Sequence, residues 1–283
     1  MTYFEIAEKM KIIDTTSVPL TSDILFPFAF EEYVCRGVGE GSMQPIVHIW
    51  RHQRAFVVGL RDRKLPYALE AMQDLEKQGY NVTVRNSGGA AVPLDPGVVN
   101  LSFIIPNPQG KLDFHQDFEL MYLAIRESLR QIAPSMVNKG EVSGSYCPGD
   151  FDLSIAGKKF CGIAQRRQTK AFIIHAFITV EGSGEERGKL VKDFYHKASG
   201  GATELHYPNV QPATMASLSE LTDLSSAEAF VTYLKGYLKE NGLWVEENQY
   251  DSIHHDAIKK TMHDLMLRYE KRDRYESPQQ IQL

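Results

Sequence analysis

Residues 144–167 read GSYCPGDFDLSIAGKKFCGIAQRR and join a cysteine-bearing turn to a β-hairpin. The glycine, serine and proline around Cys147 are typical of turns, so we expect its thiol to be exposed. Residues 156–158 form the expected hairpin turn, and Lys159 begins the return strand. An exposed thiol is open to oxidation, which favours a chemical use for it. Two simpler interpretations stay open, a small buried cysteine and a solvated lysine at a sheet edge.

Short runs rich in β-branched and aromatic residues surround this hairpin. They lie at residues 45–50, 55–60, 81–86, 98–105, 152–157, 159–165 and 171–180. Helices punctuate these runs without a regular β-α-β rhythm, so we predict an α+β fold with mixed or antiparallel sheets and flanking helices. No linker or repeat divides the chain. We therefore expect a single domain over residues 1–283, with a helical C-terminal extension from about residue 225.

Amphipathic patterns predict helices over residues 64–80, 117–132, 225–242 and 253–271. Pro66 suits the first turn of the first helix, and Gly79 suits its end. Ser225 and Glu228 have the spacing of a capping box at the start of the third. The tail after the last helix is expected to fray.

The composition narrows the class of protein. The chain has 283 residues, a formal net charge of -5 and three unevenly spaced cysteines. Such cysteines form neither a disulfide framework nor a zinc site, which favours a reducing compartment and predicts a cytoplasmic protein. We find no signal peptide pattern and no apolar run long enough to span a bilayer. The net negative charge argues against nucleic acid as the main partner.

A glycine-rich segment, RNSGGAAVPLDPGVVNLSF, covers residues 85–103 between two predicted strands. Gly88 and Gly89 let backbone N–H groups approach a ligand closely, and Arg85 adds a fork of donors. A tight turn between two core strands is the simpler interpretation. The segment matches neither a dinucleotide-binding fingerprint nor a phosphate-binding P-loop.

Taken together, RNSGGAAV at residues 85–92 and KFCGIA at residues 159–164 resemble the lipoate/octanoate protein transferase and ligase family. This family shares its catalytic fold with biotin protein ligases, and its members carry Arg-Arg-x-Ser-Gly-Gly-Gly-Ala-Val and Lys-x-x-Gly-x-Ala segments. The run HIWRHQRAFVVGL at residues 48–60 is also similar to the family's Trp-containing strand pair. The resemblance covers roughly residues 28–180 and implies a biotin/lipoate protein ligase-like catalytic fold.

The resemblance also implies roles for individual residues. Lys159 falls on the family lysine that touches the acyl carbonyl, and we expect it to shuttle a proton as well. Cys147 falls where the cysteine-dependent octanoyltransferases place their nucleophile, and SYCPGDFDLSI is most similar to those that take the acyl group from the glycine cleavage H protein. The implied substrate-binding residues are Arg85, Ser87, Gly88, Gly89, Ala90, Asp95 and Gly162.

The implied activity is an amide exchange without cofactor or metal. An octanoyl group would pass from octanoyl-lysine of the H protein, through a Cys147 thioester, to the lipoyl-domain lysine of 2-oxoacid dehydrogenase E2 subunits. Three departures from the ligase pattern, Asn86, Ala90 and Pro93-Leu94, argue against ATP-dependent activation. His254, His255 and His263 lack the spacing of a helical metal pair.

Other interpretations remain open. The donor could be octanoyl-acyl carrier protein, or the protein could be an ATP-dependent lipoate ligase, a Cys-His hydrolase or a lipoyl-domain binding module. A hydrolase would use His48, His115 or His175 as its base. Contact between Cys147 and Lys159 requires the loop at residues 143–149 to fold back over the hairpin.

Two further features are expected around the site. Candidate residues for an apolar acyl tunnel are Val57, Val58, Leu60, Ala90, Ala91 and Val92. Candidate basic residues for docking an acidic lipoyl domain are Arg51, Arg54, Arg61, Arg63, Lys64, Arg166, Arg167 and Lys170.

Overall fold

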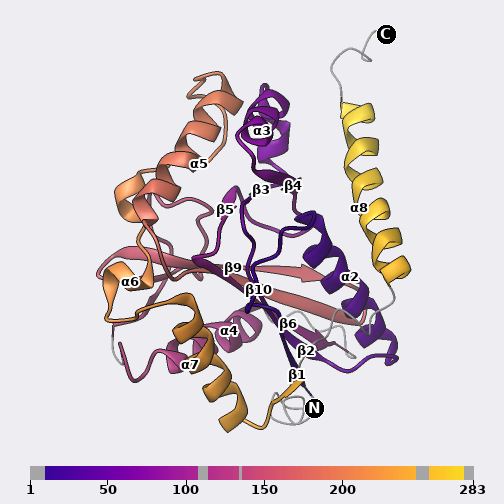
Figure 1. The fold of residues 1–283 in the computed structure, drawn as a ribbon. Helices are drawn as coiled ribbons and strands as arrows, with labels where there is room; N and C mark the ends of the chain where they lie inside the picture. Colours follow the sequence, from indigo (N-terminus) through magenta and orange to yellow (C-terminus); the bar gives the residue numbers. More distant parts are fainter. Residues whose placement is uncertain (1–9, 108–113, 134–135, 247–254, 277–283) are drawn as a thin grey trace.

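The computed structural model describes residues 10–107, 114–133, 136–246 and 255–276 (Figure 1). Within these residues the strands form two sheets. The larger has, in spatial order, β11 (Trp244–Glu246), β1 (Lys11–Asp14), β2 (Ile46–Trp50), β6 (Val98–Pro106), β10 (Ala171–Thr179), β9 (Lys158–Arg167), β8 (Leu153–Ile155) and β7 (Asn138–Lys139). The smaller has β4 (Asn81–Val84), β3 (Ala55–Val58) and β5 (Val92–Leu94).

Both sheets are mixed. In the larger sheet β1 pairs in parallel with β2 and β11, and the other neighbouring strands are antiparallel. In the smaller sheet β3 pairs in parallel with β4 and antiparallel with β5. The hairpin expected at residues 156–158 is present as β8 and β9, and Ala156 and Gly157 both have positive φ at its turn. The predicted α+β class is confirmed.

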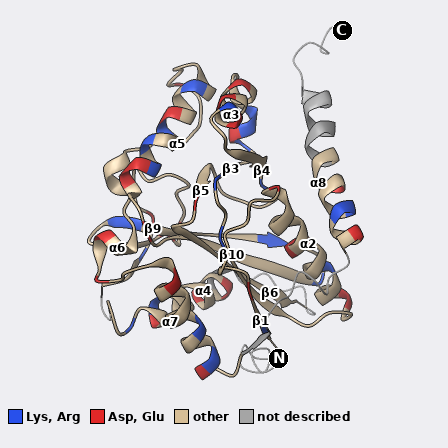
Figure 2. Ribbon diagram, viewed as in Figure 1, with Lys and Arg blue, Asp and Glu red and all other residues tan. Residues whose placement is uncertain are grey.

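Helices cover both faces of the large sheet. As Figure 1 shows, α4 (Phe114–Ser128) and α7 (Ala227–Glu240) lie on one side, and α2 (Leu25–Glu40) lies on the other with α8 (His255–Glu276) alongside it. α3 (Ala68–Lys77) and α5 (Gly184–Ser199) pack together beside the small sheet. Charged side chains gather on the helices, while the central strands are mostly uncharged (Figure 2). None of the described helices combines the length and apolar character needed to cross a bilayer.

The strands carry the core because alternate side chains point to opposite faces. In β10, Ile174 packs into the cluster with α4 and α7, whereas Ile173 packs into the cluster with α2 and α8. A third cluster joins the small sheet to α3 and α5, and it includes Cys147. A strand covered on both faces is almost continuously apolar, which explains the AFIIHAFIT run. His175 is the polar exception in that run.

The first predicted helix is shorter than expected. The prediction covered residues 64–80, but α3 begins at Ala68. Leu65 is extended, with ψ 146°, because the residue before a proline is pushed out of the helical region. Gly79 has φ +85° and follows the helix end, as expected. Leu69, an apolar residue of this amphipathic helix, is 50% exposed.

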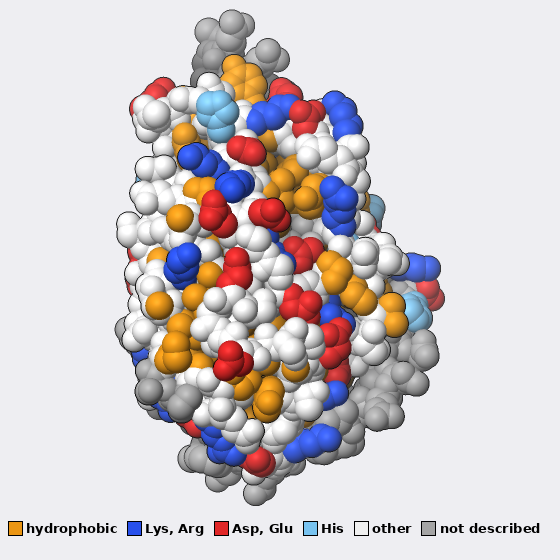
Figure 3. All heavy atoms as spheres, turned by 60° about the vertical axis from the view of Figure 1, so that its left-hand side comes forward, with side chains coloured by type: hydrophobic (Ala, Val, Ile, Leu, Met, Phe, Trp, Pro, Cys, Tyr) orange, Lys and Arg blue, Asp and Glu red, His pale blue; other side chains and the backbone are white. Residues whose placement is uncertain are grey.

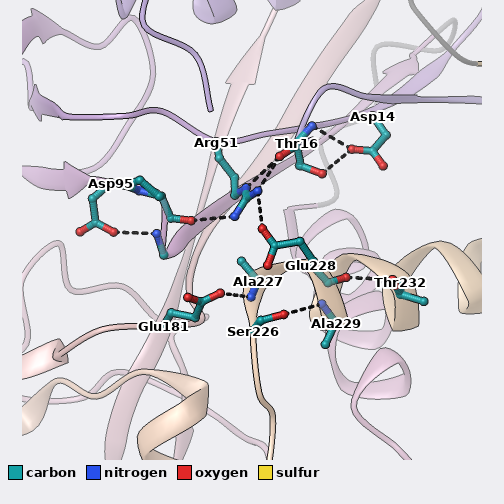
Figure 4. A network of polar contacts seen from close by, with 12 residues as sticks. Asp14, Thr16, Arg51, Asp95, Glu181, Ser226, Ala227, Glu228, Ala229 and Thr232 are labelled. Atoms are coloured by element: carbon teal, nitrogen blue, oxygen red, sulfur yellow. Dashed lines mark hydrogen bonds and ion pairs between the residues drawn. The ribbon is translucent and has the colours of Figure 1, made fainter. Parts of the chain in front are cut away.

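The start of α7 is fixed by a polar network rather than by the predicted capping box (Figure 4). The capping residue is Ser226, whose Oγ accepts the Ala229 N–H at 3.1 Å. Glu228 instead pairs with Arg51 Nη2 at 2.7 Å. Glu181 accepts the Ala227 N–H, so both charged groups hold the helix start against the sheet.

The C-terminal extension is less purely helical than the sequence predicted. After α7 the chain forms β11, which adds to the large sheet beside β1. α8 then runs to Glu276, beyond the predicted end at residue 271. The remaining tail, residues 277–283, lies outside the described residues.

Candidate active site

Cys147 lies where the glycine-rich segment after β4 meets the loop before β8. The Ala90 N–H donates to its Sγ at 3.1 Å, and Arg85 Nη1 lies 3.9 Å from the same sulfur. Both groups place positive charge beside the atom on which a thiolate develops. Cys147 also has φ +48°, a strained value for a residue other than glycine. Such strain persists where surrounding contacts impose it, and it recurs at functional sites.

The prediction of an exposed Cys147 thiol is wrong, because the residue is only 8% exposed. The loop folds back over the sheet, and the fully buried ring of Tyr146 stacks on Phe177 with centroids 5.6 Å apart. On the other side the Gln211 N–H donates to the Gly144 carbonyl at 2.7 Å. The residue types predicted the bend, but contacts with distant parts of the chain bury it.

Lys159 enters the interior beneath this loop. Its Nζ donates to the carbonyl oxygens of Cys147 at 2.6 Å and Tyr146 at 2.9 Å, and it lies 2.8 Å from Asp152 Oδ1. An ammonium has three N–H donors, so all three are used. Burial raises the pKa of Asp152, and the adjacent Lys159 charge opposes that rise. The loop therefore does return to Lys159, but the contact is with the main chain of Cys147.

The glycine-rich segment curls around the Arg85 guanidinium. Nη1 donates to the Gly88 carbonyl at 3.1 Å. Gly89 has φ +108°, and a Cβ on it would lie 2.2 Å from Arg85 Nη1 and 3.1 Å from Cys147 Sγ. Only glycine fits there. Arg85 Nε is buried and has no hydrogen-bond partner among the described residues. The segment is thus more than a tight turn, because it brings donors to the sulfur.

Two cavities share Ser87, and Cys147 lines one of them. The inner one is narrow, about 40 Å³, and Cys147 lies in its wall. Its apolar lining includes Phe28, Trp50, Val57, Val92, Leu94 and Phe177. The outer one is an open groove of about 680 Å³ lined by the glycine-rich segment, Pro148 and the end of β9. Ser87 therefore lies between a narrow apolar slot and an accessible groove.

Four of the six expected tunnel residues divide between these cavities, and Val58 and Ala91 line neither of the two. Val57 and Val92 line the inner one, and Leu60 and Ala90 line the outer one. Gly162 also lines the inner cavity, where a Cβ would lie 2.5 Å from Phe177 Cε1. The Phe177 ring therefore leaves no room for a side chain at position 162, which explains why that residue is glycine.

Asp95 lies outside this site. Its carboxylate forms a bidentate pair with Arg187, at 2.7 Å to Nε and 2.6 Å to Nη2. Both residues line a separate surface cavity of about 440 Å³. We therefore leave Asp95 out of the site around Cys147, although the motif placed it there.

Comparison with known proteins shows the family to which the chain belongs. The family model described as the lipoyl protein ligase A/B catalytic domain matches residues 23–239. The chain belongs to this family. The resemblance inferred from the two motifs is confirmed, and the match extends beyond both ends of the region that the motifs suggested.

Curated relatives of this lipoyl protein ligase A/B domain cover most of the chain. An octanoyl-[GcvH]:protein N-octanoyltransferase of Anoxybacillus flavithermus is 44% identical over 212 residues, 75% of this chain and 76% of its own. One of Geobacillus kaustophilus is 40% identical over 255 residues, 86% and 90% of the two chains. A lipoyl-[GcvH]:protein N-lipoyltransferase of Listeria monocytogenes is 38% identical over 213 residues, 75% and 76%. The predicted enzyme class, a protein acyltransferase, is confirmed.

Solved structures share the fold of this lipoyl protein ligase A/B domain. A lipoate-protein ligase A bound with ATP superposes with a TM-score of 0.64 at 20% identity, covering 91% of this chain and 93% of that one. A bipartite lipoate protein ligase from Thermoplasma acidophilum gives 0.60 at 20% identity, covering 91% of each. The expected lipoate ligase-like fold is confirmed.

The basic residues of this lipoyl protein ligase A/B domain do not act as one docking patch. Arg51 is 4% exposed and donates to the Thr16 carbonyl inside the fold (Figure 4). Arg166 and Arg167 line the outer cavity, and they pair there with Glu32 and Asp117, respectively. Acidic and basic side chains are interspersed on the face drawn in Figure 3. Only part of the predicted set lies at the groove.

Two polar groups near the glycine-rich segment were not singled out from the sequence. The Tyr195 hydroxyl accepts the Ala91 N–H at 3.1 Å, and Asp62 Oδ2 accepts the Gly59 N–H at 2.9 Å. Burial raises the pKa of both side chains. Tyr195 lies on α5, more than a hundred residues from its partner, so no local pattern marked it.

Glu31 is a further unpredicted group. It is 1% exposed, and its Oε1 bonds to His48 Nδ1 at 2.8 Å and Trp50 Nε1 at 3.2 Å. Its signal was a carboxylate inside the apolar run FAFEEYVC. His48 and His175, considered above as bases for a hydrolase, flank Glu31 instead. The side chain of His115 lies outside the described part of the chain.

Proposed function

We propose that the protein transfers an octanoyl group from octanoyl-lysine of the glycine cleavage H protein to the lipoyl-domain lysine of E2 subunits. The observation that carries the proposal is that Cys147 lines a largely apolar slot while the next residue, Pro148, lines an open groove. The slot suits an alkyl tail, and the groove suits the lysine arm of a partner protein. The names of the relatives support the H protein as donor.

The first half-reaction forms a thioester. The Cys147 thiolate adds to the amide carbonyl of the donor, so the C–S bond forms and the negative charge passes to the carbonyl oxygen; the C–N bond then breaks as the carbonyl re-forms. The departing lysine amine takes up a proton, which water in the outer groove supplies. Arg85, with its buried Nε free of described partners, stabilises the negative charge that passes from sulfur to the carbonyl oxygen.

The second half-reaction reverses these steps with a new amine. The neutral acceptor lysine attacks the thioester, the C–S bond breaks, and the proton lost from nitrogen returns to the groove. An amide is broken and an amide is formed, so the exchange is close to balanced and requires no ATP. Burial of the tail in the inner cavity keeps the thioester away from water.

Lys159 takes a different part from the acid and carbonyl contact expected from the motif. All three of its donors hold the loop and Asp152. We assign it the positioning of Cys147, because its ammonium fixes the carbonyls on which the strained turn depends. A cytoplasmic location stays a prediction from the cysteine usage.

The test follows octanoyl transfer by intact-protein mass spectrometry. The protein is mixed with octanoyl-H protein and an apo lipoyl domain, without ATP. The variant Cys147→Ala removes the proposed nucleophile. Cys35→Ala is the matched control, because burial raises the pKa of Cys35 to about 12 and keeps that thiol protonated.

Transfer with an acyl adduct, retained in Cys35→Ala and lost in Cys147→Ala, supports the thioester route. Transfer only from octanoyl-acyl carrier protein keeps the mechanism and changes the donor. Full transfer by Cys147→Ala refutes the proposed nucleophile.

A further inference from the structure

A row of polar side chains crosses the large sheet at one end of the inner cavity. His48 of β2, Ser102 of β6 and His175 of β10 are register partners, and Ala164 of β9 continues the row. Ser102, His175 and Ala164 line the cavity. Glu31 reaches over this row from α2, with Oε1 2.8 Å from His48 Nδ1 and Oε2 3.7 Å from His175 Nδ1.

Several polar atoms at this end have no hydrogen-bond partner among the described residues. They are Glu31 Oε2 and both ring nitrogens of His175. Both side chains line the inner cavity. Buried polar groups in proteins are nearly always hydrogen-bonded. Several buried polar atoms that face one cavity without a hydrogen-bond partner therefore require a functional explanation. The acyl-transfer steps above use none of them.

The opposite end of the cavity is the reacting end. A second row of register partners, Trp50, Asn100, Phe177 and Gly162, lies two residues along the strands from the first. Cys147 lines the same cavity, and its carbonyl is bonded to Lys159, whose Cε lies 3.4 Å from a Cβ placed on Gly162. An acyl tail on Cys147 therefore enters beside the second row and runs toward the first.

The separation of the rows matches one acyl length. Two residues along a strand span about 7 Å. An extended chain advances about 1.2 Å per bond, so an octanoyl tail spans about 8 Å. A tail of that length that enters beside the second row would reach the row that contains His175.

We propose that Glu31 and His175 form a polar floor that limits the acyl chain to about the octanoyl length, a selection that rests on the function proposed above. A longer tail would press methylene groups against these atoms and leave them with neither water nor a protein partner. An octanoyl tail meets the floor only with its last methyl group, and ordered water beside that group can still satisfy the polar atoms.

The charge of Glu31 agrees with this selection. Burial raises the pKa of its carboxyl, but the adjacent His175 and His48 outweigh burial and lower it to about 2. The floor therefore carries an ionised carboxylate, which methylene groups cannot solvate.

The test measures transfer rates from H protein carrying hexanoyl, octanoyl, decanoyl or dodecanoyl groups. His175→Ala shortens the floor side chain, while Glu31 keeps its bonds to His48 and Trp50. His175→Gln keeps a polar group at the same position. Ile174→Val is the matched control, since it alters the same strand on the opposite face. Circular dichroism verifies the fold of each variant.

We expect wild-type transfer to fall by at least about tenfold from octanoyl to decanoyl. His175→Ala should raise the decanoyl-to-octanoyl ratio about tenfold, whereas His175→Gln and Ile174→Val should leave the ratio near the wild-type value. Ala164→Val adds bulk in the same row and should move the optimum toward hexanoyl, which keeps the test open if His175→Ala does not fold.

Equal wild-type rates for octanoyl and dodecanoyl would overturn the polar floor. So would an unchanged ratio in both His175→Ala and Ala164→Val while octanoyl transfer persists. Absence of transfer from every acyl donor, by contrast, would overturn the proposed function itself.

Discussion

The Nζ of Lys159 lies 2.6 Å from the carbonyl oxygen of Cys147 and 2.8 Å from Asp152 Oδ1, and both charged side chains are almost fully buried. A buried ion pair whose N–H donors are all hydrogen-bonded holds its partners in fixed positions, because breaking any one of these bonds leaves a buried charge without a partner. Cys147 is therefore oriented through its own main-chain carbonyl. Its sulfur stays beside Arg85, where the proposed function requires the acyl group to bind.

Lys159→Met should destabilise the protein by about 3–5 kcal/mol, because it leaves Asp152 buried without its counter-charge. Octanoyl transfer should be lost together with the order of the loop. Urea denaturation and the transfer assay measure the two effects. Lys158→Met is the control, since Lys158 is exposed one residue earlier on the same strand and should change neither. Wild-type stability in Lys159→Met would contradict the positioning role.

Arg85→Met should slow octanoyl transfer by about a hundredfold, because it removes the positive charge beside Cys147 Sγ. Alkylation of Cys147 by iodoacetamide should slow as well, which reports on the sulfur without any acyl substrate. Arg36→Met, an exposed arginine on α2, should leave both rates unchanged. An Arg85→Met protein that is alkylated and acylated at the wild-type rate would rule out this electrostatic role.

Gly162→Ala should cost about 1–3 kcal/mol of stability and close the inner cavity, because the new Cβ would lie 2.5 Å from Phe177. Adding Phe177→Leu should recover part of the loss, since a smaller side chain relieves the overlap. Gly236→Ala is the contrasting substitution. It lies inside α7 with nothing within 4 Å of its Cβ, and alanine should stabilise that helix by up to about 1 kcal/mol. Thermal unfolding measures the stability of the three variants. A Gly162→Ala protein as stable as the wild type would contradict the packing argument.

The acid stability of the protein should depend on Glu31. Its pKa falls from 4.5 to about 2 in the folded state, so the unfolded chain binds the proton more readily. The stabilisation, about 3 kcal/mol, should be fully present above pH 4.5 and be lost as the pH falls toward 2. Urea denaturation across this range should show the wild type losing its advantage over Glu31→Gln. A difference between the two proteins that does not vary with pH would be inconsistent with a buried, ionised Glu31.

Much of the fold followed from local pattern. The seven predicted β-rich runs correspond to β2, β3, β4, β6, β8, β9 and β10. They were predictable because β-branched and aromatic side chains favour the half-buried, pleated surface of a strand. Helix ends were less predictable. Because of Pro66, α3 begins at Ala68 rather than at residue 64. Glu228 pairs with Arg51 instead of capping α7, and no local pattern predicts the position of Arg51. The short strands β1, β5, β7 and β11 were missed because their pairing partners, not their own residues, make them strands.

The candidate site divides in the same way. The sequence by itself determined which residue types were available, namely a cysteine on a turn, a lysine on the return strand and glycines after Arg85, since turn chemistry and motif spacing act over a few residues. The tertiary structure alone decided that Cys147 is buried, that Lys159 meets its carbonyl, and that Asp95 lies elsewhere. These relations depend on strand register and on contacts across some sixty residues, such as that between Arg85 and Cys147. Such contacts form only when packing of the whole core closes the intervening loops.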